Sequence, residues 1–214
     1  MTPGVSGAVR AVREDHLGAS TFVEKGWNLI AIGNFAEAEK ALRWALELAP
    51  SDSRAKALLG WAFMRQGMLP EAESILVGLL AENTLHTMAR VNLGYVCMRK
   101  GNRTRAAELL LIPSRQTRDP QAALYAMFYR GLLLAAEREF TESEHCLRAA
   151  ISLAPNFIEG YYELGRTQLC AGMEEQARAT WKAGHAANRF NIWGKRCAEA
   201  IRCADRGEMA PSYS

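Results

Sequence analysis

Five glycines recur along this chain at a nearly fixed interval, each at the same place in a copy of one pattern. Successive members are separated by 34, 34, 37 and 34 residues. They are Gly26, Gly60, Gly94, Gly131 and Gly165. Self-similarity at a period of this length is typical of a solenoid, in which each repeat buries its apolar face only against its neighbours. The spacing therefore predicts a stack of repeated units.

Each repeat reads as two helices joined at a short break. In the first repeat, a helix through Ile32 is followed by Gly33-Asn34 and by a second helix from Phe35 to about Leu48, before Pro50. Gly and Asn supply the turn, and Pro cannot continue a helix. The expected repeats are 19–52, 53–86, 87–123, 124–157 and 158–191.

The third repeat departs from this scheme. Its second helix begins on schedule near Arg103, but Pro113 is expected to end it early. Residues 113–120 lie between two prolines and are predicted to form a loop. This loop accounts for the three extra residues between Gly94 and Gly131.

Two further segments flank the repeats. Apolar residues at three- and four-residue steps predict a short amphipathic helix from Val5 to Leu17, which Gly18 separates from the first repeat. At the other end, 192–206 is predicted to form a capping helix, and 207–214 a tail. The apolar face of this capping helix carries Trp193, Cys197, Ala200, Ile201 and Ala204. Such a helix covers the apolar side that the last repeat would otherwise expose.

The copies resemble the tetratricopeptide repeat. The first copy carries Phe22, Lys25, Gly26, Leu29, Ala38, Leu42, Ala45 and Pro50, and the fifth carries Tyr161, Leu164, Gly165, Gln168, Ala177 and Trp181. The resemblance spans about 19–190, with Lys25 and Arg130 replacing the family's Leu. It implies an all-α, right-handed superhelical solenoid of about five helix-turn-helix units with a C-terminal capping helix, whose first helices line a concave groove.

Helical geometry identifies the residues on the groove side of each first helix, opposite the small Gly. They are Trp27, Ile30, Trp61, Met64, Arg65, Tyr95, Met98, Arg99, Tyr125, Phe128 and Tyr162. These helices are apolar on both faces, and an exposed apolar surface usually marks a binding site. We therefore expect a chaperone-like adaptor that holds a hydrophobic or amphipathic protein segment, with arginines as a polar rim. Replacing Trp61 and Tyr95 by Glu is expected to abolish binding without loss of stability.

Two alternatives to partner binding stay open at this point. The apolar stripe is internal if the superhelix is tightly wound or if 5–17 folds back into the groove. The chain is a self-assembling scaffold, and a homo-oligomer, if the groove receives a neighbour's terminal helix. The Lys and Asn clamp with which some family members hold a peptide carboxylate is absent, since Val23, Trp27 and Leu58 occupy its places and only Asn92 matches.

Charge gives weaker indications. The formal net charge of +3 does not favour nucleic acid as a general partner. A basic run is either a solvated turn or a contact for an acidic partner or nucleic acid, and it comprises Arg99, Lys100, Arg103, Arg105, Arg115 and Arg118. An acidic turn offers an opposite charge for head-to-tail association, and it comprises Glu137, Glu139, Glu142 and Glu144.

Nothing in the sequence predicts catalysis, a cofactor or a metal site. No Gly-rich phosphate loop, GxSxG or HExxH motif occurs, and none of the five cysteines lies in a CxxC pair. The neighbours His145 and Cys146 are a remote hypothesis for a cysteine-dependent enzyme, although adjacent helical residues point about 100° apart. With no secretory signal or membrane span apparent, we expect a cytoplasmic protein.

Overall fold

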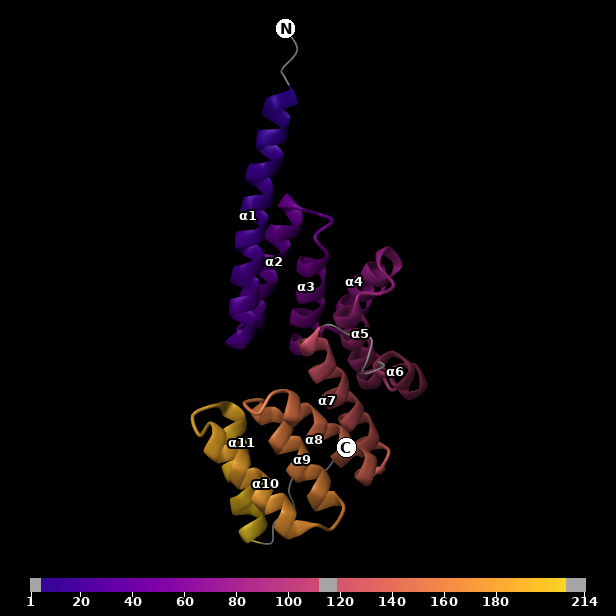
Figure 1. Cartoon of the computed structure of the whole chain (residues 1–214), viewed down its shortest axis with the longest axis vertical. Coiled ribbons are helices and arrows are strands. Elements are labelled where there is room, and N and C mark those ends of the chain that lie inside the picture. The colour runs from indigo at the N-terminus through magenta and orange to yellow at the C-terminus, as the bar shows by residue number, and fades with distance from the viewer. Residues whose placement is uncertain (1–4, 112–118, 207–214) are drawn as a thin grey trace. The chain divides into compact units, whose positions relative to one another are not determined.

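The structure is a computed structural model that describes residues 5–111 and 119–206, with side chains from residue 18 onward. The described residues form only helices. They are α1 (Val5–Ala31), α2 (Phe35–Leu48), α3 (Ser53–Gln66), α4 (Leu69–Glu82), α5 (Thr87–Arg99), α6 (Arg103–Leu110), α7 (Pro120–Ala136), α8 (Phe140–Leu153), α9 (Ile158–Cys170), α10 (Glu174–Ala187) and α11 (Ile192–Asp205) (Figure 1). The all-α prediction and the helix-turn-helix repeats are confirmed.

The chain divides into two compact units, Met1–Gly101 and Asn102–Ser214. We call them the amino-terminal and carboxy-terminal units. The boundary falls within the third repeat, so that α5 belongs to the first unit and α6 to the second. We call the first helix of each repeat its A helix and the second its B helix.

The recurring glycines allow the two helices of a repeat to approach closely. A Cβ added at Gly26, Gly60 or Gly131 would lie within 3 Å of a leucine sixteen residues later. The partners are Leu42, Leu76 and Leu147, and in the fifth repeat a Cβ at Gly165 would overlap the ring of Trp181. All four partners are fully buried. In these four repeats the recurring glycine therefore marks where the A helix packs on its own B helix.

Four of the breaks between A and B helices contain a glycine with φ near +80°. These are Gly33, Gly67, Gly101 and Gly172. The fourth repeat has Arg138 at this place, with φ of 65°. A residue with a Cβ is disfavoured in this left-handed region by about 1–2 kcal/mol.

We expect Arg138→Gly to raise the free energy of unfolding by about 1 kcal/mol, because glycine relieves the left-handed strain. Chemical denaturation followed by circular dichroism measures this. The matched control is Gly172→Ala, which places a Cβ in the same conformation one repeat later and is expected to lower stability by a similar amount. A destabilised Arg138→Gly variant would contradict the prediction.

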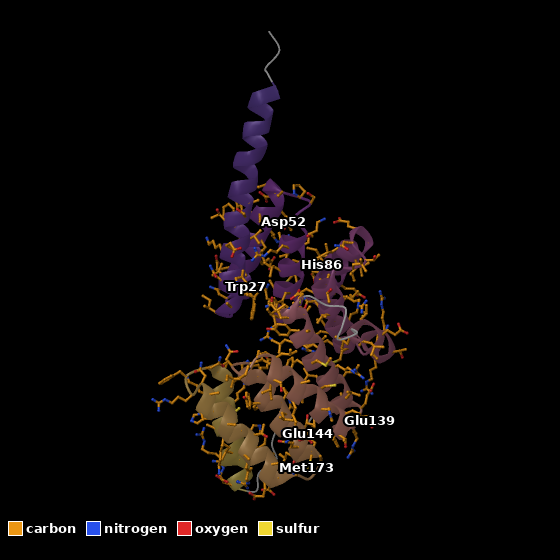
Figure 2. All side chains as sticks on the ribbon, viewed as in Figure 1. Trp27, Asp52, His86, Glu139, Glu144 and Met173 are labelled. Carbon is orange, nitrogen blue, oxygen red and sulfur yellow. The ribbon has the colours of Figure 1, made fainter. Side chains whose placement is uncertain are left out.

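Side chains at the helix starts agree with the sequence pattern. Asp52 accepts a hydrogen bond from the Ala55 N–H, and His86 Nδ1 accepts one from the Ala89 N–H, so these residues cap α3 and α5 (Figure 2). Pro70 lies in the first turn of α4, where its missing N–H costs little.

The predicted separation at Gly18 is wrong, because α1 runs without interruption from Val5 to Ala31. A Cβ at Gly18 would lie 3.3 Å from the Leu48 side chain, so this glycine is a close-packing position beside α2. Figure 1 shows α1 continuing past α2 toward the amino terminus. Residues 5–17 therefore extend the axis of α1, and the alternative in which they fold back over the groove is not supported.

The end of α6 and the start of α7 flank the predicted loop of the third repeat. The B helix of the third repeat ends at Leu110, as the early stop predicts, whereas the expected loop at 113–118 lies outside the described residues. The next helix begins at Pro120, four residues before the expected start of the repeat, because Asp119 caps it by accepting from the N–H groups of Gln121 and Ala122.

The capping helix is confirmed. Cys197 and Ala200 of α11 are buried in one cluster with residues of α9 and α10, among them Trp181. The remaining apolar residues of this face of α11 pack against the same cluster, and they are Trp193, Ile201 and Ala204.

Candidate functional site

The A helices of the amino-terminal unit form one layer, in which α3 contacts both α1 and α5. The candidate site is the face of this layer that carries Trp27, Trp61 and Tyr95, which we call the A-helix face. Figure 2 labels Trp27 on α1, and its ring lies 5.9 Å from that of Trp61 on α3, with the two planes tilted by 46°. The pattern of one aromatic residue directly after each recurring glycine thus brings aromatic rings together across neighbouring repeats.

The predicted site residues of this unit differ in exposure. Three of them are largely buried, namely Ile30 at 5% exposure, Trp61 at 8% and Met64 at 2%. Trp27, Tyr95 and Met98 are half-buried, and Arg65 and Arg99 are exposed. The accessible apolar surface is thus smaller than the sequence suggests, and it lies mainly on α1 and α5.

Both exposed arginines stack on aromatic rings. The guanidinium of Arg65 lies 5.4 Å from the centre of the Phe35 ring, and that of Arg99 lies 5.8 Å from the centre of the Tyr95 ring. Arg99 Nη1 also donates a hydrogen bond of 2.9 Å to the Tyr95 hydroxyl. The contact with Tyr95 holds Arg99 beside the A-helix face, whereas the ring partner of Arg65 belongs to the B helix α2.

The predicted site residues of the carboxy-terminal unit pack against other aromatic side chains of that unit. Phe128 is 1% exposed and meets the ring of Phe157 edge-on at 4.9 Å, while the half-buried Tyr125 lies 5.7 Å from the same ring. Tyr162 is 8% exposed and lies 5.5 Å from Trp193. Burial raises the pKa of Tyr162. Of the predicted site residues in this unit, Phe128 and Tyr162 are therefore largely buried, and Tyr125 is half-buried.

Sequence reasoning did not identify the buried polar groups. In the carboxy-terminal unit, Gln168 is fully buried, donates to Glu144 at 2.8 Å and accepts from Thr180 at 2.7 Å. Ser143 donates to the carbonyl of Gly131 at 2.8 Å. Gln168 takes a place where other repeats have a larger apolar residue such as Leu29 or Phe63, so it departs from the pattern, whereas Ser143 fits its small-residue position and gives no signal.

Asn92 of α5 is 1% exposed, and its Nδ2 has no hydrogen-bond partner among the described residues. A buried amide of this kind lowers stability by about 1–3 kcal/mol. The polar match to the family's carboxylate clamp is therefore a covered side chain and not part of the accessible surface.

The hypothesis of a cysteine-dependent enzyme gains no support. Cys146 is buried, and desolvation raises the pKa of its thiol, which disfavours the reactive thiolate, whereas His145 is exposed. Desolvation also raises the pKa of Cys197 to about 12. Within the described ranges, no group of three or more His, Cys, Asp or Glu residues is placed to hold a metal ion.

The two charged patches are partly engaged within the protein. Lys100 forms an ion pair with Glu73, while Arg103 and Arg105 are exposed on α6, and the remaining residues of the basic run, Arg115 and Arg118, lie outside the described residues. Of the acidic turn, Glu137, Glu139 and Glu142 are exposed, whereas Glu144 pairs with Arg148 at 2.7 Å.

A cavity of about 490 Å³ lies between α8, α9 and α10 of the carboxy-terminal unit, and its lining includes none of the residues predicted to bind. Tyr161, Leu164 and Ala183 form part of its wall. None of the helices in the described ranges has the length and apolar character needed to cross a membrane.

Comparisons with known proteins agree with this architecture. A tetratricopeptide-repeat family model matches residues 23–82. Comparison with curated protein sequences found no match.

Several solved structures share the fold. A thermophilic tetratricopeptide protein of Thermus thermophilus is 22% identical, with a TM-score of 0.74 over 86% of this chain and 99% of that one. PilF of Pseudomonas aeruginosa is 19% identical, with a TM-score of 0.64 over 90% of this chain and 88% of its own. YrrB, described as a tetratricopeptide protein with an unusual peptide-binding site, is 18% identical, with a TM-score of 0.52 over 89% and 97%.

Residues 23–82 thus match the tetratricopeptide-repeat family model, and the described helices share the fold of solved tetratricopeptide-repeat proteins.

Proposed function

We propose that this protein is a non-catalytic adaptor that binds a hydrophobic or amphipathic segment of a partner protein against the A-helix face of its amino-terminal unit. The observation that carries the proposal is the accessible apolar surface on that face. Trp27, Tyr95 and Met98 are half-buried, and the exposed Arg99 stacks on the ring of Tyr95. Aromatic, methionine and arginine side chains are enriched at the centres of protein interfaces.

The tetratricopeptide fold supports an interaction module, and YrrB is one structural relative described as having a peptide-binding site. Chaperone-like handling of the partner and a cytoplasmic location remain predictions from the sequence. Ile30, Trp61 and Met64 are largely buried, so the accessible side chains of this face project from a rigid apolar layer. Such rigidity lowers the entropy lost on binding.

Self-assembly is a second proposal, supported by the additional length of α1. The segment from Val5 to Leu17 extends about 20 Å by helical rise beyond the part that packs beside α2. If it binds a second copy of the chain, light scattering will show oligomers that disappear when residues 1–17 are removed. A concentration-independent monomer would contradict self-assembly.

Affinity capture from native lysate tests the adaptor proposal. We expect Trp27→Ala combined with Tyr95→Ala to reduce recovery of a specific partner at least about tenfold, because interface aromatics commonly contribute about 2 kcal/mol or more each. The control is Trp44→Ala, which removes a tryptophan that is 57% exposed on the B helix α2. Equal recovery by all three proteins, with folding verified by circular dichroism, would overturn the proposed surface.

A further inference from the structure

Charge in the amino-terminal unit is segregated between its A and B helices. The A helices α3 and α5 contain no carboxylate and five cations, which are Arg54, Lys56, Arg65, Arg90 and Arg99. The B helices α2 and α4 contain two cations and six carboxylates, which are Glu37, Glu39, Glu47, Glu71, Glu73 and Glu82. The described side chains of α1 add one charge of each sign, Glu24 and Lys25.

Part of this positive charge is balanced by carboxylates inside the unit. Arg54 pairs with Glu24 at 2.6 Å, and Lys56 pairs with Glu82 at 2.6 Å. The exposed Arg65 stacks on the Phe35 ring of α2, and the exposed Arg99 stacks on the Tyr95 ring of the A-helix face.

Arg99 contacts both the hydroxyl and the ring of Tyr95. It donates a hydrogen bond to the Tyr95 hydroxyl, and none of the described residues places a carboxylate within ion-pair distance of it. A guanidinium has five N–H donors in a planar fork that matches a carboxylate. Stacking on Tyr95 fixes the direction of this fork, so less conformational entropy is lost when a carboxylate binds.

The carboxy-terminal unit lacks this segregation. Its A helices α7 and α9 together carry two cations, Arg130 and Arg166, and two carboxylates, Glu159 and Glu163, and Arg166 pairs with Glu163 at 2.9 Å. Its capping helix α11 also mixes both signs. The excess of positive charge on A helices is thus a property of the amino-terminal unit, whose A-helix face also carries the half-buried Trp27 and Tyr95.

From these observations we infer that the segment bound on the A-helix face is acidic as well as apolar, and that Arg99, held by Tyr95, binds one of its carboxylates. This inference rests on the proposed function and states the chemistry of its partner. A carboxylate placed beside apolar residues complements both the positive charge of α3 and α5 and the rings of Trp27 and Tyr95.

Selection from a random dodecapeptide library displayed on phage tests the inference without knowledge of the natural partner. The bait is the full chain, as wild type, Arg99→Glu and Arg105→Glu. Arg105 is exposed on α6, so that its reversal changes the net charge equally without altering the A-helix face. Arg99→Gln removes the positive charge without adding a negative one. It replaces Arg99→Glu if the melting temperature of that variant lies well below that of the wild type.

We expect the peptides selected by the wild type and by Arg105→Glu to be enriched at least about twofold in Asp and Glu over the starting library. The enrichment is expected to disappear for Arg99→Glu and for Arg99→Gln. Equal acidic content among peptides selected by the Arg99 variants and the wild type would overturn the role of Arg99.

Other outcomes separate this inference from the proposed function. Selected peptides that depend on Trp27 and Tyr95 but carry no excess of acidic residues would overturn the inference and leave the apolar site standing. If the wild type selects no peptide, the inference and the proposed function are both contradicted. Displacement of selected peptides by short single-stranded DNA would overturn the assignment to a protein segment.

Discussion

Replacement of Trp181 by Ala is expected to lower the free energy of unfolding of the carboxy-terminal unit by about 3–5 kcal/mol. Trp181 is fully buried beside the backbone of Gly165 and shares a cluster with residues of α9 and α11. Its indole N–H donates a 3.0 Å hydrogen bond to the carbonyl of Tyr162. The substitution therefore opens a large cavity at the place where the last repeat meets its capping helix.

Denaturation followed by far-ultraviolet circular dichroism measures this effect. The matched control, Trp44→Ala, removes the same side chain from an exposed position and is expected to change stability by less than about 1 kcal/mol. Trp181→Phe keeps most of the volume and is expected to give an intermediate loss. A loss for Trp181→Ala as small as that of the control would contradict the packing described for the fifth repeat.

Replacement of Trp61 by Glu is expected to destabilise the amino-terminal unit by at least about 3–5 kcal/mol. Only 8% of Trp61 is exposed, and its ring packs 5.9 Å from that of Trp27. The substitution removes this aromatic contact and leaves a carboxylate in a largely desolvated place, which adds a further cost. The melting temperature of the variant is expected to fall well below that of the wild type.

This expectation differs from the one that the sequence favours, in which Trp61→Glu leaves stability unchanged. The comparison is Tyr95→Glu, at a half-buried position of the same face, which is expected to lose much less stability. An unchanged melting temperature for Trp61→Glu would show that this ring is more accessible than the structure indicates. Trp27 and Tyr95 are for this reason better positions for testing binding.

The repeat architecture was predictable because its causes are local. The small residue at Gly26 and its equivalents and the left-handed glycines at the breaks each fix a short segment of backbone, and both sets recur at nearly one period. The break predicted at Gly18 was wrong because a glycine between apolar residues is typical both of a helix break and of a close helix–helix contact. The structure shows the contact, since Gly18 packs against Leu48.

The exposure of the candidate site was less predictable. Helical geometry places Trp27, Trp61 and Met64 on one face, but it does not show how far neighbouring side chains cover one another. Trp61 and Met64 are covered, whereas Trp27 remains half-buried. The left-handed conformation of Arg138 was likewise not predictable from the positions of glycines, because the surrounding repeat imposes it on a residue with a Cβ.

Site-specific photo-crosslinking tests most directly whether the A-helix face holds a partner. A photoreactive phenylalanine analogue is placed at Tyr95 in one protein and at Trp44, on α2, in another, and each is irradiated in native lysate. The account predicts a discrete cross-linked protein from position 95 that is absent from position 44. Cross-links of the same protein from both positions, or from position 44 alone, would contradict the assignment of the A-helix face as the binding surface.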